Sequence, residues 1–361
     1  MRSLIDFFDE EEFDNLKLRL GEHVSGSRSL KLSVFSIISL TNFIELLQKE
    51  HIENFNIIVQ EKKDYWIINV DRVIERSDIE GGKRTISGVA YVEKPAHKRI
   101  WHIATTENLD FQKNCIERMI SLLRPRISRF YLTSNEIKSI FSRFEEKKYS
   151  IMVKKAILYT HKEEGDISFE KQPYFRTFNE AEESDMYVDK IEFVIRKNRI
   201  ALHGFVTREG ISKFIRGDVS FFYKEFLPLL ANYGEEKRIK LNKKEKKLNF
   251  EVKPLALKFK DKIIENSSEN KRIVASLQNL SSSSVFIYHL NPYLHVSLFD
   301  FIDGSSCDIF VSSPDEISVI PSYTCSVFSL MRIFNQLSKD FQEGNLIEKE
   351  KKEISFMDFF E

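Results

Sequence analysis

One order of segments recurs three times along this chain of 361 residues. A run of short segments with alternating apolar residues leads to a polar helix cap and then to a helix with one apolar stripe, over residues 109–124, 219–233 and 325–342. Alternation with period two indicates half-buried strands, whereas apolar residues three and four apart indicate a helix covered on one side. Because the residue identities do not repeat, we infer a shared architecture and not a sequence repeat.

The segment from Trp101 to Tyr149 shows this order most clearly. Its first four residues alternate like the end of a strand, and Asn108 can cap the helix that follows. Pro125 ends that helix, because proline disfavours helical geometry in the residue before it. Thr133 and Glu136 then have the spacing of a capping box, which predicts a second helix. The two helices carry apolar stripes at Ile116, Met119, Ile120 and Leu123, and at Ile137, Ile140, Phe141 and Phe144.

Strand runs interrupted by single helices predict the α+β class, with antiparallel sheets each covered by one or two helices in three sheet-plus-helix units. A later helix, residues 219–233, contains Pro228, which should kink it, and Gly234, which could end it with a left-handed cap. The expected domains are an N-terminal tail (1–20), an N-terminal α+β domain (21–160), a C-terminal α+β domain (161–345, with a possible split near 235–260) and a C-terminal tail (346–361).

The composition favours a chain that works inside the cell. Lys+Arg and Asp+Glu are equal at 55 each, so any attraction to nucleic acid must be local. Three cysteines without a CxxC pair suit a reducing compartment. No apolar run approaches the roughly 20 residues that span a bilayer. We therefore expect a cytoplasmic protein without a membrane partner.

Motifs for catalysis are sparse. The phosphate-loop, dinucleotide, HExxH and GxSxG patterns are absent, and no cofactor or metal is expected. Glu251 and Lys253 have the E-x-K form of metal-dependent nucleases, in a predicted strand, but no partner acid is evident. Asp300, Asp303 and Asp308 surround Gly304, where they could hold a divalent cation or form a hairpin turn.

The histidines of the last strands do not form a catalytic pattern. His295 and Ser297 alternate in a predicted strand, and His289 comes six residues earlier. A His-x-Ser strand could serve a phosphoesterase only if a second copy faced it, and that copy is missing. We expect these histidines to be structural or exposed.

One segment is strongly basic. Between Lys237 and Lys262 there are eleven Lys or Arg residues against three acids, with Phe250 and Phe259 interleaved. Such a segment could contact phosphates, or it could be a solvated loop that balances acidic regions elsewhere. The candidate nucleic-acid-binding residues are Lys237, Arg238, Lys240, Lys243, Lys244, Lys246 and Lys247.

The two ends of the chain share one pattern. Residues 3–8 and 355–360 both read Ser, apolar, apolar, Asp, Phe, Phe. Ser and Asp three apart can cap one helical turn, and that turn would gather the apolar residues on one side. Such a plug fits a shallow hydrophobic pocket on a partner. The plug residues would be Leu4, Phe7 and Phe8 at one end and Phe356, Phe359 and Phe360 at the other.

This pattern resembles the sliding-clamp-binding peptide called the PIP box. The resemblance covers only the two ends, and it implies a sliding clamp as partner. It departs from the motif where Glu353 and Met1 stand at the glutamine position. The ends could instead dock on the protein's own core or bridge subunits.

Three hypotheses follow. The first is a non-enzymatic interaction protein of DNA maintenance, such as DNA repair, or of antiviral defence. It would be recruited through its ends and would contact nucleic acid through the basic segment. The second is a metal-dependent nuclease that uses Glu251 and Lys253. The third is a structural subunit of a multiprotein assembly.

Overall fold

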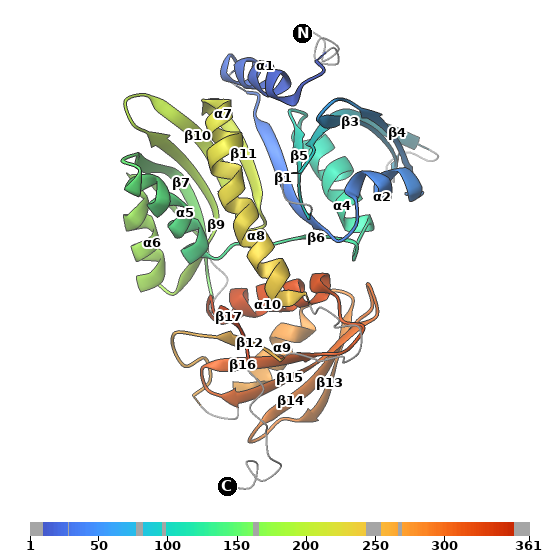
Figure 1. The fold of residues 1–361 in the computed structure, drawn as a ribbon. Helices are drawn as coiled ribbons and strands as arrows, with labels where there is room; N and C mark the ends of the chain where they lie inside the picture. The colour runs from blue at the N-terminus through green and yellow to red at the C-terminus, as the bar shows by residue number, and fades with distance from the viewer. Residues whose placement is uncertain are drawn as a thin grey trace. The chain divides into compact units, whose positions relative to one another are not determined.

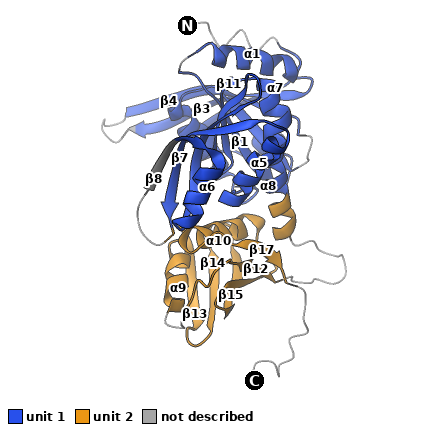
Figure 2. Ribbon diagram, turned by 90° about the vertical axis from the view of Figure 1, so that its left-hand side faces the viewer, with its two compact units in different colours: residues 1–160, 164–235 blue, residues 161–163, 236–361 orange. Residues whose placement is uncertain are grey.

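The computed structural model describes residues 10–27, 29–76, 82–95, 99–161, 166–242, 254–265 and 269–349, without the side chains of residues 76, 166–170 and 312. These residues form helices and antiparallel sheets, which confirms the α+β class. Figure 2 shows two compact units: residues 1–160 with 164–235, and residues 161–163 with 236–361.

Three modules share one order of elements: a strand, a helix, four strands and a second helix (Figure 1). Module 1 consists of β1 (Leu32–Ser39), α2 (Phe43–Lys49), β2 (Phe55–Glu61), β3 (Tyr65–Arg76), β4 (Gly82–Glu93), β5 (Ile100–Thr105) and a continuous helix of α3 (Leu109–Phe111), η2 (Gln112–Glu117) and α4 (Arg118–Leu122).

Module 2 consists of β6 (Ile127–Arg129), α5 (Ser134–Glu146), β7 (Ser150–Thr160), β9 (Met186–Arg196), β10 (Ile200–Thr207), β11 (Ile211–Gly217) and a continuous helix of α7 (Val219–Phe221), η3 (Phe222–Phe226) and α8 (Leu227–Leu241). Between β7 and β9 it carries two further elements, β8 (Asp166–Pro173) and α6 (Tyr174–Glu183).

Module 3 consists of β12 (Leu255–Lys258), α9 (Asn270–Gln278), β13 (Ser283–His289), β14 (Leu294–Asp300), β15 (Ser305–Ser313), β16 (Glu316–Pro321) and α10 (Val327–Asp340), and β17 (Asn345–Glu348) extends its sheet. Its strand order is β13-β14-β15-β16-β12-β17, and module 1 has the corresponding order β2-β3-β4-β5-β1. In both modules the first strand therefore lies beside the last of the four strands of the meander, β1 beside β5 and β12 beside β16.

Modules 1 and 2 share one 11-stranded sheet, because β1 pairs with both β11 and β6. Phe35 lies opposite Ile211 and Leu32 lies opposite Phe214 in the β1–β11 ladder. Phe35 belongs to the core under the module 1 helix, whereas Phe214 contacts Phe222 of the module 2 helix. Since residues 32 and 35 point to opposite faces of a strand, the two helices cover opposite faces of the shared sheet.

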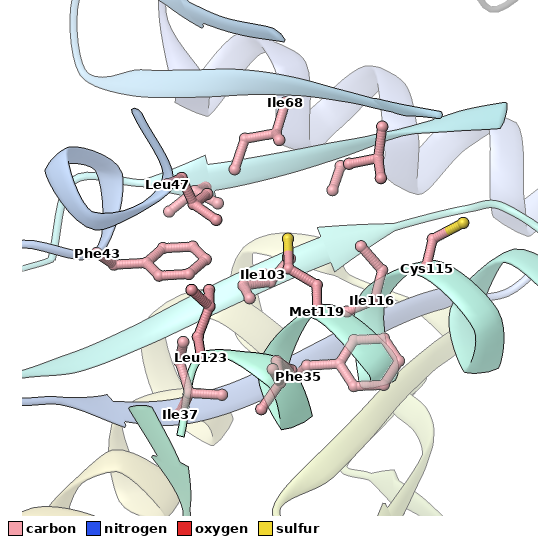
Figure 3. Packing of buried hydrophobic residues seen from close by; sticks show 14 of the residues in the cluster. Phe35, Ile37, Phe43, Leu47, Ile68, Ile103, Cys115, Ile116, Met119 and Leu123 are labelled. Carbon is pink, nitrogen blue, oxygen red and sulfur yellow. The ribbon is translucent and has the colours of Figure 1, made fainter. Parts of the chain in front are cut away.

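The module 1 core lies between the sheet and helices α2 and α4 (Figure 3). Phe35 and Ile103 come from neighbouring strands, while Cys115 and Met119 come from the helix above them. Asn108 caps this helix by accepting a hydrogen bond from the Phe111 N–H at 2.9 Å, as its position in the sequence predicts. The stripe of residues expected from the sequence is the one that is buried.

The next helix also begins as the sequence predicts. Thr133 and Glu136 form a complete capping box at the start of α5. Phe141 of this helix packs edge-on against Phe193 of β9, with ring centroids 4.8 Å apart. The cap therefore starts a helix whose apolar stripe lies on the module 2 part of the sheet.

The end of the module 2 helix was predicted wrongly. The helix continues through Gly234 to Leu241, so Gly234 is not a left-handed cap. A side chain at Gly234 would lie 2.8 Å from the buried ring of Phe130, and the glycine therefore provides room for that ring. Pro228 is the second residue of α8, two residues after the end of the wide turn η3 at Phe226, where the loss of one N–H donor is tolerated.

Residues 13–25 form a helix, α1 (Phe13–Ser25), that the sequence analysis did not predict. Its apolar stripe of Leu16, Leu20 and Val24 is buried, and Phe13 contacts the rings of Tyr65 and Tyr223. Gly21 allows close approach to Val219, which a side chain would meet at 2.7 Å. Among the described residues, no helix is long and apolar enough to cross a membrane.

Candidate nucleic-acid interface

Most of the residues nominated from the sequence lie outside the described residues. These are the terminal aromatics and their neighbours (Leu4, Phe7, Phe8, Phe356, Phe359 and Phe360), the E-x-K pair (Glu251 and Lys253), and part of the basic segment (Lys243, Lys244, Lys246 and Lys247).

The described part of the basic segment is divided between buried and exposed side chains. Lys237 and Arg238 lie near the end of α8 and are buried, with 5% and 9% of their surface exposed. Lys240, Lys258, Lys260 and Lys262 are exposed. Phe259 is buried, so this ring is not available for stacking on a base. The exposed lysines among the described residues of this segment therefore lie at the end of α8 and in and after β12 of module 3.

The sheet of module 3 has one covered face. Leu294, Val296 and Leu298 of β14 are buried and share this face with Asp300. Asp300 accepts hydrogen bonds from Ser329 and Arg332 of α10, and α9 contacts β13 and β14. The residues between them in β14, beginning with His295, therefore point to the opposite face.

Three rings form a continuous stack across that opposite face. His295 lies directly opposite Phe310 in the β14–β15 ladder, and their ring centroids are 4.3 Å apart with an interplanar angle of 18°. Tyr288 stacks on the other side of His295 at 4.7 Å and 29°. Tyr288 can take this place because β13 has a bulge between Ile287 and His289. We call Tyr288, His295 and Phe310 the ring row.

Further apolar side chains surround the ring row. Phe286 lies on the same face, opposite Ser297, and is 57% exposed. Phe299 also lies on this face and contacts Phe301, with ring centroids 5.2 Å apart. Tyr288 is 66% exposed. Large, exposed aromatic side chains that gather on one sheet face are uncommon on a surface that meets only water.

Polar groups hold the ring row in place. Asp308 accepts a hydrogen bond from Ser297, and its carboxylate is 3.6 Å from His295 Nε2. His295 Nε2 has no hydrogen-bond partner among the described residues. Further along the same row, the Lys349 ammonium donates to Ser318 Oγ at 2.8 Å. The row therefore consists of stacked rings with Tyr288 exposed at one end, and the Lys349 ammonium at the other end is also paired with Glu316.

The aspartates near Gly304 form structural contacts. Asp300 pairs with Arg332 at 2.5 Å, and Asp303 accepts from the Ser305 N–H at 2.9 Å and from the Ser326 hydroxyl. These bonds fasten α10 to the β14–β15 turn. Within the described ranges, no three His, Cys, Asp or Glu side chains are grouped as a metal site would need.

The ring row was not predicted, although the sequence contains a signal for part of it. Half-buried strands should alternate apolar and polar residues, but residues 285–288 read Val-Phe-Ile-Tyr, so both faces of this strand are apolar. A run of this kind fits a fully buried strand, and here it belongs to a sheet edge with one exposed face. No protein-family model matches this chain, and no curated protein matches it significantly.

Proposed function

We propose that this protein is a non-enzymatic interaction protein of DNA maintenance or defence, and that module 3 binds single-stranded nucleic acid on the ring row. The observation that carries the proposal is the stack of Tyr288, His295 and Phe310, in which the outermost ring, Tyr288, is exposed and the other two are partly buried. The chain ends would then recruit a protein partner.

Stacking is the first support. Aromatic rings on neighbouring strands give unstacked bases a platform, and each stacked base contributes about 1–3 kcal/mol to binding. The outermost ring, Tyr288, has an exposed face on which a base can continue the existing stack. A single strand suits this arrangement because its bases are free to leave their own stack.

Charge is the second support. The strand β12 of the same sheet lies within the basic segment, which has eleven Lys or Arg residues and three acids between Lys237 and Lys262. Lys258, Lys260 and Lys262 are exposed lysines of this segment in and after β12, and the Lys258 ammonium is paired with Asp315 at 2.8 Å. Lysines of this kind neutralise phosphates and make binding depend steeply on salt.

The test is the binding of a fluorescently labelled single-stranded DNA of fifteen thymidines, followed by anisotropy. We expect Tyr288→Ser to weaken binding roughly 5- to 150-fold, which corresponds to the loss of one stacked base. Because Tyr288 is 66% exposed, the substitution should leave the fold intact. The matched control is Tyr323→Ser, since Tyr323 is also 66% exposed and lies outside the ring row.

Two results would contradict this proposal. One is equal affinity of the wild type and Tyr288→Ser, and the other is an equal loss in the Tyr323→Ser control. A duplex of the same sequence should bind more weakly than the single strand, because its bases are not free to stack on a protein ring.

The chain ends carry the recruitment part of the proposal. Its support is the repeated Ser, apolar, apolar, Asp, Phe, Phe pattern, whose resemblance to a PIP box points to a sliding clamp. We expect a purified sliding clamp to retain the wild-type chain, and the double substitution Phe359→Ala/Phe360→Ala to abolish retention if the C-terminal end is the plug. The corresponding change at Phe7 and Phe8 tests the other end. If the variant with alanine at Phe7, Phe8, Phe359 and Phe360 were retained as well as the wild type, the recruitment part of the proposal would be contradicted. The proposal for the ring row would not be affected.

A further inference from the structure

A pocket of about 230 Å³ in module 1 brings together two arginine side chains that lack carboxylate partners. It is lined by residues 50–55 and by Arg72, Arg118, Leu122 and Leu123. Arg72 and Arg118 make no ion pair among the described residues. The pocket lies in the first compact unit, whereas the ring row belongs to the second. It is thus a separate feature of the molecule.

Arg72 is held in place by neutral groups. Its Nη1 donates to the Asn114 carbonyl at 2.5 Å, and its guanidinium lies over the Phe55 ring at 5.3 Å from the centroid. Its Nε is buried and has no hydrogen-bond partner among the described residues. A buried donor without an acceptor is costly, and the neutral Asn114 carbonyl does not compensate the positive charge that Arg72 brings to the pocket.

An irregular bond where η2 ends accounts for the free Asn114 carbonyl. The Arg118 backbone N–H donates to the Cys115 carbonyl and so does not occupy the Asn114 carbonyl, which receives Arg72. Arg118 itself begins α4, and its side chain is exposed at the pocket. Wide turns of this kind are frequent at functional sites.

Module 2 provides an internal comparison. It has the same wide turn, η3, after the N-cap Asp218, just as η2 follows the N-cap Asn108. Ten residues after each cap stand Pro228 in module 2 and Arg118 in module 1. The wide turn therefore belongs to the shared architecture, but the guanidinium belongs to module 1 alone.

The charge of the lining favours an anion. Glu50 is paired with Arg126, so Glu53 is the remaining carboxylate beside the two arginines. Two planar guanidinium groups offer forked donors that match the oxygens of a tetrahedral anion better than a point charge does. His51 adds a further nitrogen donor or acceptor to the lining.

We propose that this pocket binds a phosphate group, with Arg72 and Arg118 as the two ligating side chains. The phosphate could be a free ion or the 5′ end of a nucleic acid, and both present the same oxygens. This site goes beyond the proposed function and does not depend on the ring row.

The experiment is isothermal titration calorimetry, which measures the heat of binding of two probes to the full chain at constant ionic strength. One probe is inorganic phosphate, and the other is a 5′-phosphorylated dinucleotide compared with its unphosphorylated form. Arg118→Gln should weaken binding about tenfold or more, as expected for the loss of a charged hydrogen bond. The control is Arg143→Gln, because Arg143 is an exposed helical arginine outside the pocket.

Arg72→Lys is the second variant. It keeps the charge and removes the planar fork, so it should weaken phosphate binding while the melting temperature reports whether the fold is kept. Binding of inorganic phosphate, or of the phosphorylated dinucleotide over the unphosphorylated one, supports the site and identifies its source. The proposal is overturned if neither probe binds, or if Arg118→Gln and Arg143→Gln reduce binding equally.

Discussion

The half-buried Glu107 carboxyl group shows how burial changes the titration of a single residue in this fold. Glu107 follows β5, accepts a hydrogen bond from the Val89 N–H at 3.4 Å and lies beside Gly88. Burial raises the pKa of the Glu107 carboxyl above its ordinary value of 4.5, and the Val89 bond only partly opposes this effect. The folded chain therefore holds the Glu107 proton more tightly than the unfolded chain does.

This pKa shift predicts a pH dependence at the scale of one residue. For a carboxyl whose pKa is raised by folding, the free energy of unfolding falls as pH rises through the window above 4.5. Glu107→Gln removes the titration, so its stability relative to wild type should improve with rising pH. Urea unfolding at pH 4 and pH 8 measures the difference, and a relative stability that is the same at both pH values would contradict it.

At the scale of elements, the N-terminal caps fix where the long helices of modules 1 and 2 begin. The long helices of modules 1 and 2 begin with Asn108 and Asp218, and each side chain accepts backbone N–H groups of the first turn. Both helices then pass through a wide turn, η2 or η3, before continuing as α4 or α8. The same device thus starts two helices that cover opposite faces of the shared sheet.

These caps can be tested by paired substitutions. Asn108→Ala and Asp218→Ala should each lower the free energy of unfolding by about 1 kcal/mol, because first-turn N–H groups lose their acceptor. Asn108→Gly should cost only a few tenths of a kcal/mol, since glycine is tolerated at an N-cap. Urea titration checks both values. Equal losses for the alanine and glycine variants at position 108 would show that the cap bond is not the cause.

The whole molecule consists of two compact units, and its spectroscopic probes are unevenly divided between them. Both tryptophans, Trp66 and Trp101, lie in the first unit, with ring centroids 5.8 Å apart. The second unit depends on Asp300, which is 2% exposed and holds Arg332 and Ser329 of α10. Tryptophan fluorescence therefore follows one unit, whereas helical circular dichroism follows both.

This division makes a prediction at the scale of the molecule. Asp300→Ala leaves Arg332 without its carboxylate and should destabilise the second unit by about 3 kcal/mol. The circular dichroism transition should then split, with an early phase that tryptophan fluorescence does not show. Asp300→Ala/Arg332→Met should recover part of the loss, because it also removes the unpaired charge. A fluorescence midpoint that shifts together with the early phase would mean that the two units unfold as one.

Local signals in the sequence were sufficient for much of the fold. The capping box at Thr133, the cap at Asn108 and the meander of module 3 follow from residues a few positions apart, and the α+β class follows from their order. The end of the module 2 helix was missed because Gly234 serves the ring of Phe130, which is far away in the sequence. A local signal for a cap cannot reveal such a contact.

The candidate sites were harder to predict than the elements. The rings of Tyr288, His295 and Phe310 meet only through the register of three strands and one bulge. Arg72 and Asn114 are separated by 42 residues and meet through a wide helical turn. The arginine pocket leaves no motif in the sequence, and the apolar run at residues 285–288 marks β13 without showing which rings it meets.

The sequence by itself determined most of the strands and where most helices begin, although not α1, and it showed that a strand run followed by a striped helix occurs three times. These features depend on interactions within one or two turns, so neighbouring residues encode them. The tertiary structure alone decided that two modules share one sheet, that their long helices cover opposite faces, and that rings and arginines converge at exposed places. The reason is physical: strand register and side-chain packing join residues that are distant in the chain, and their geometry exists only once the sheets have formed.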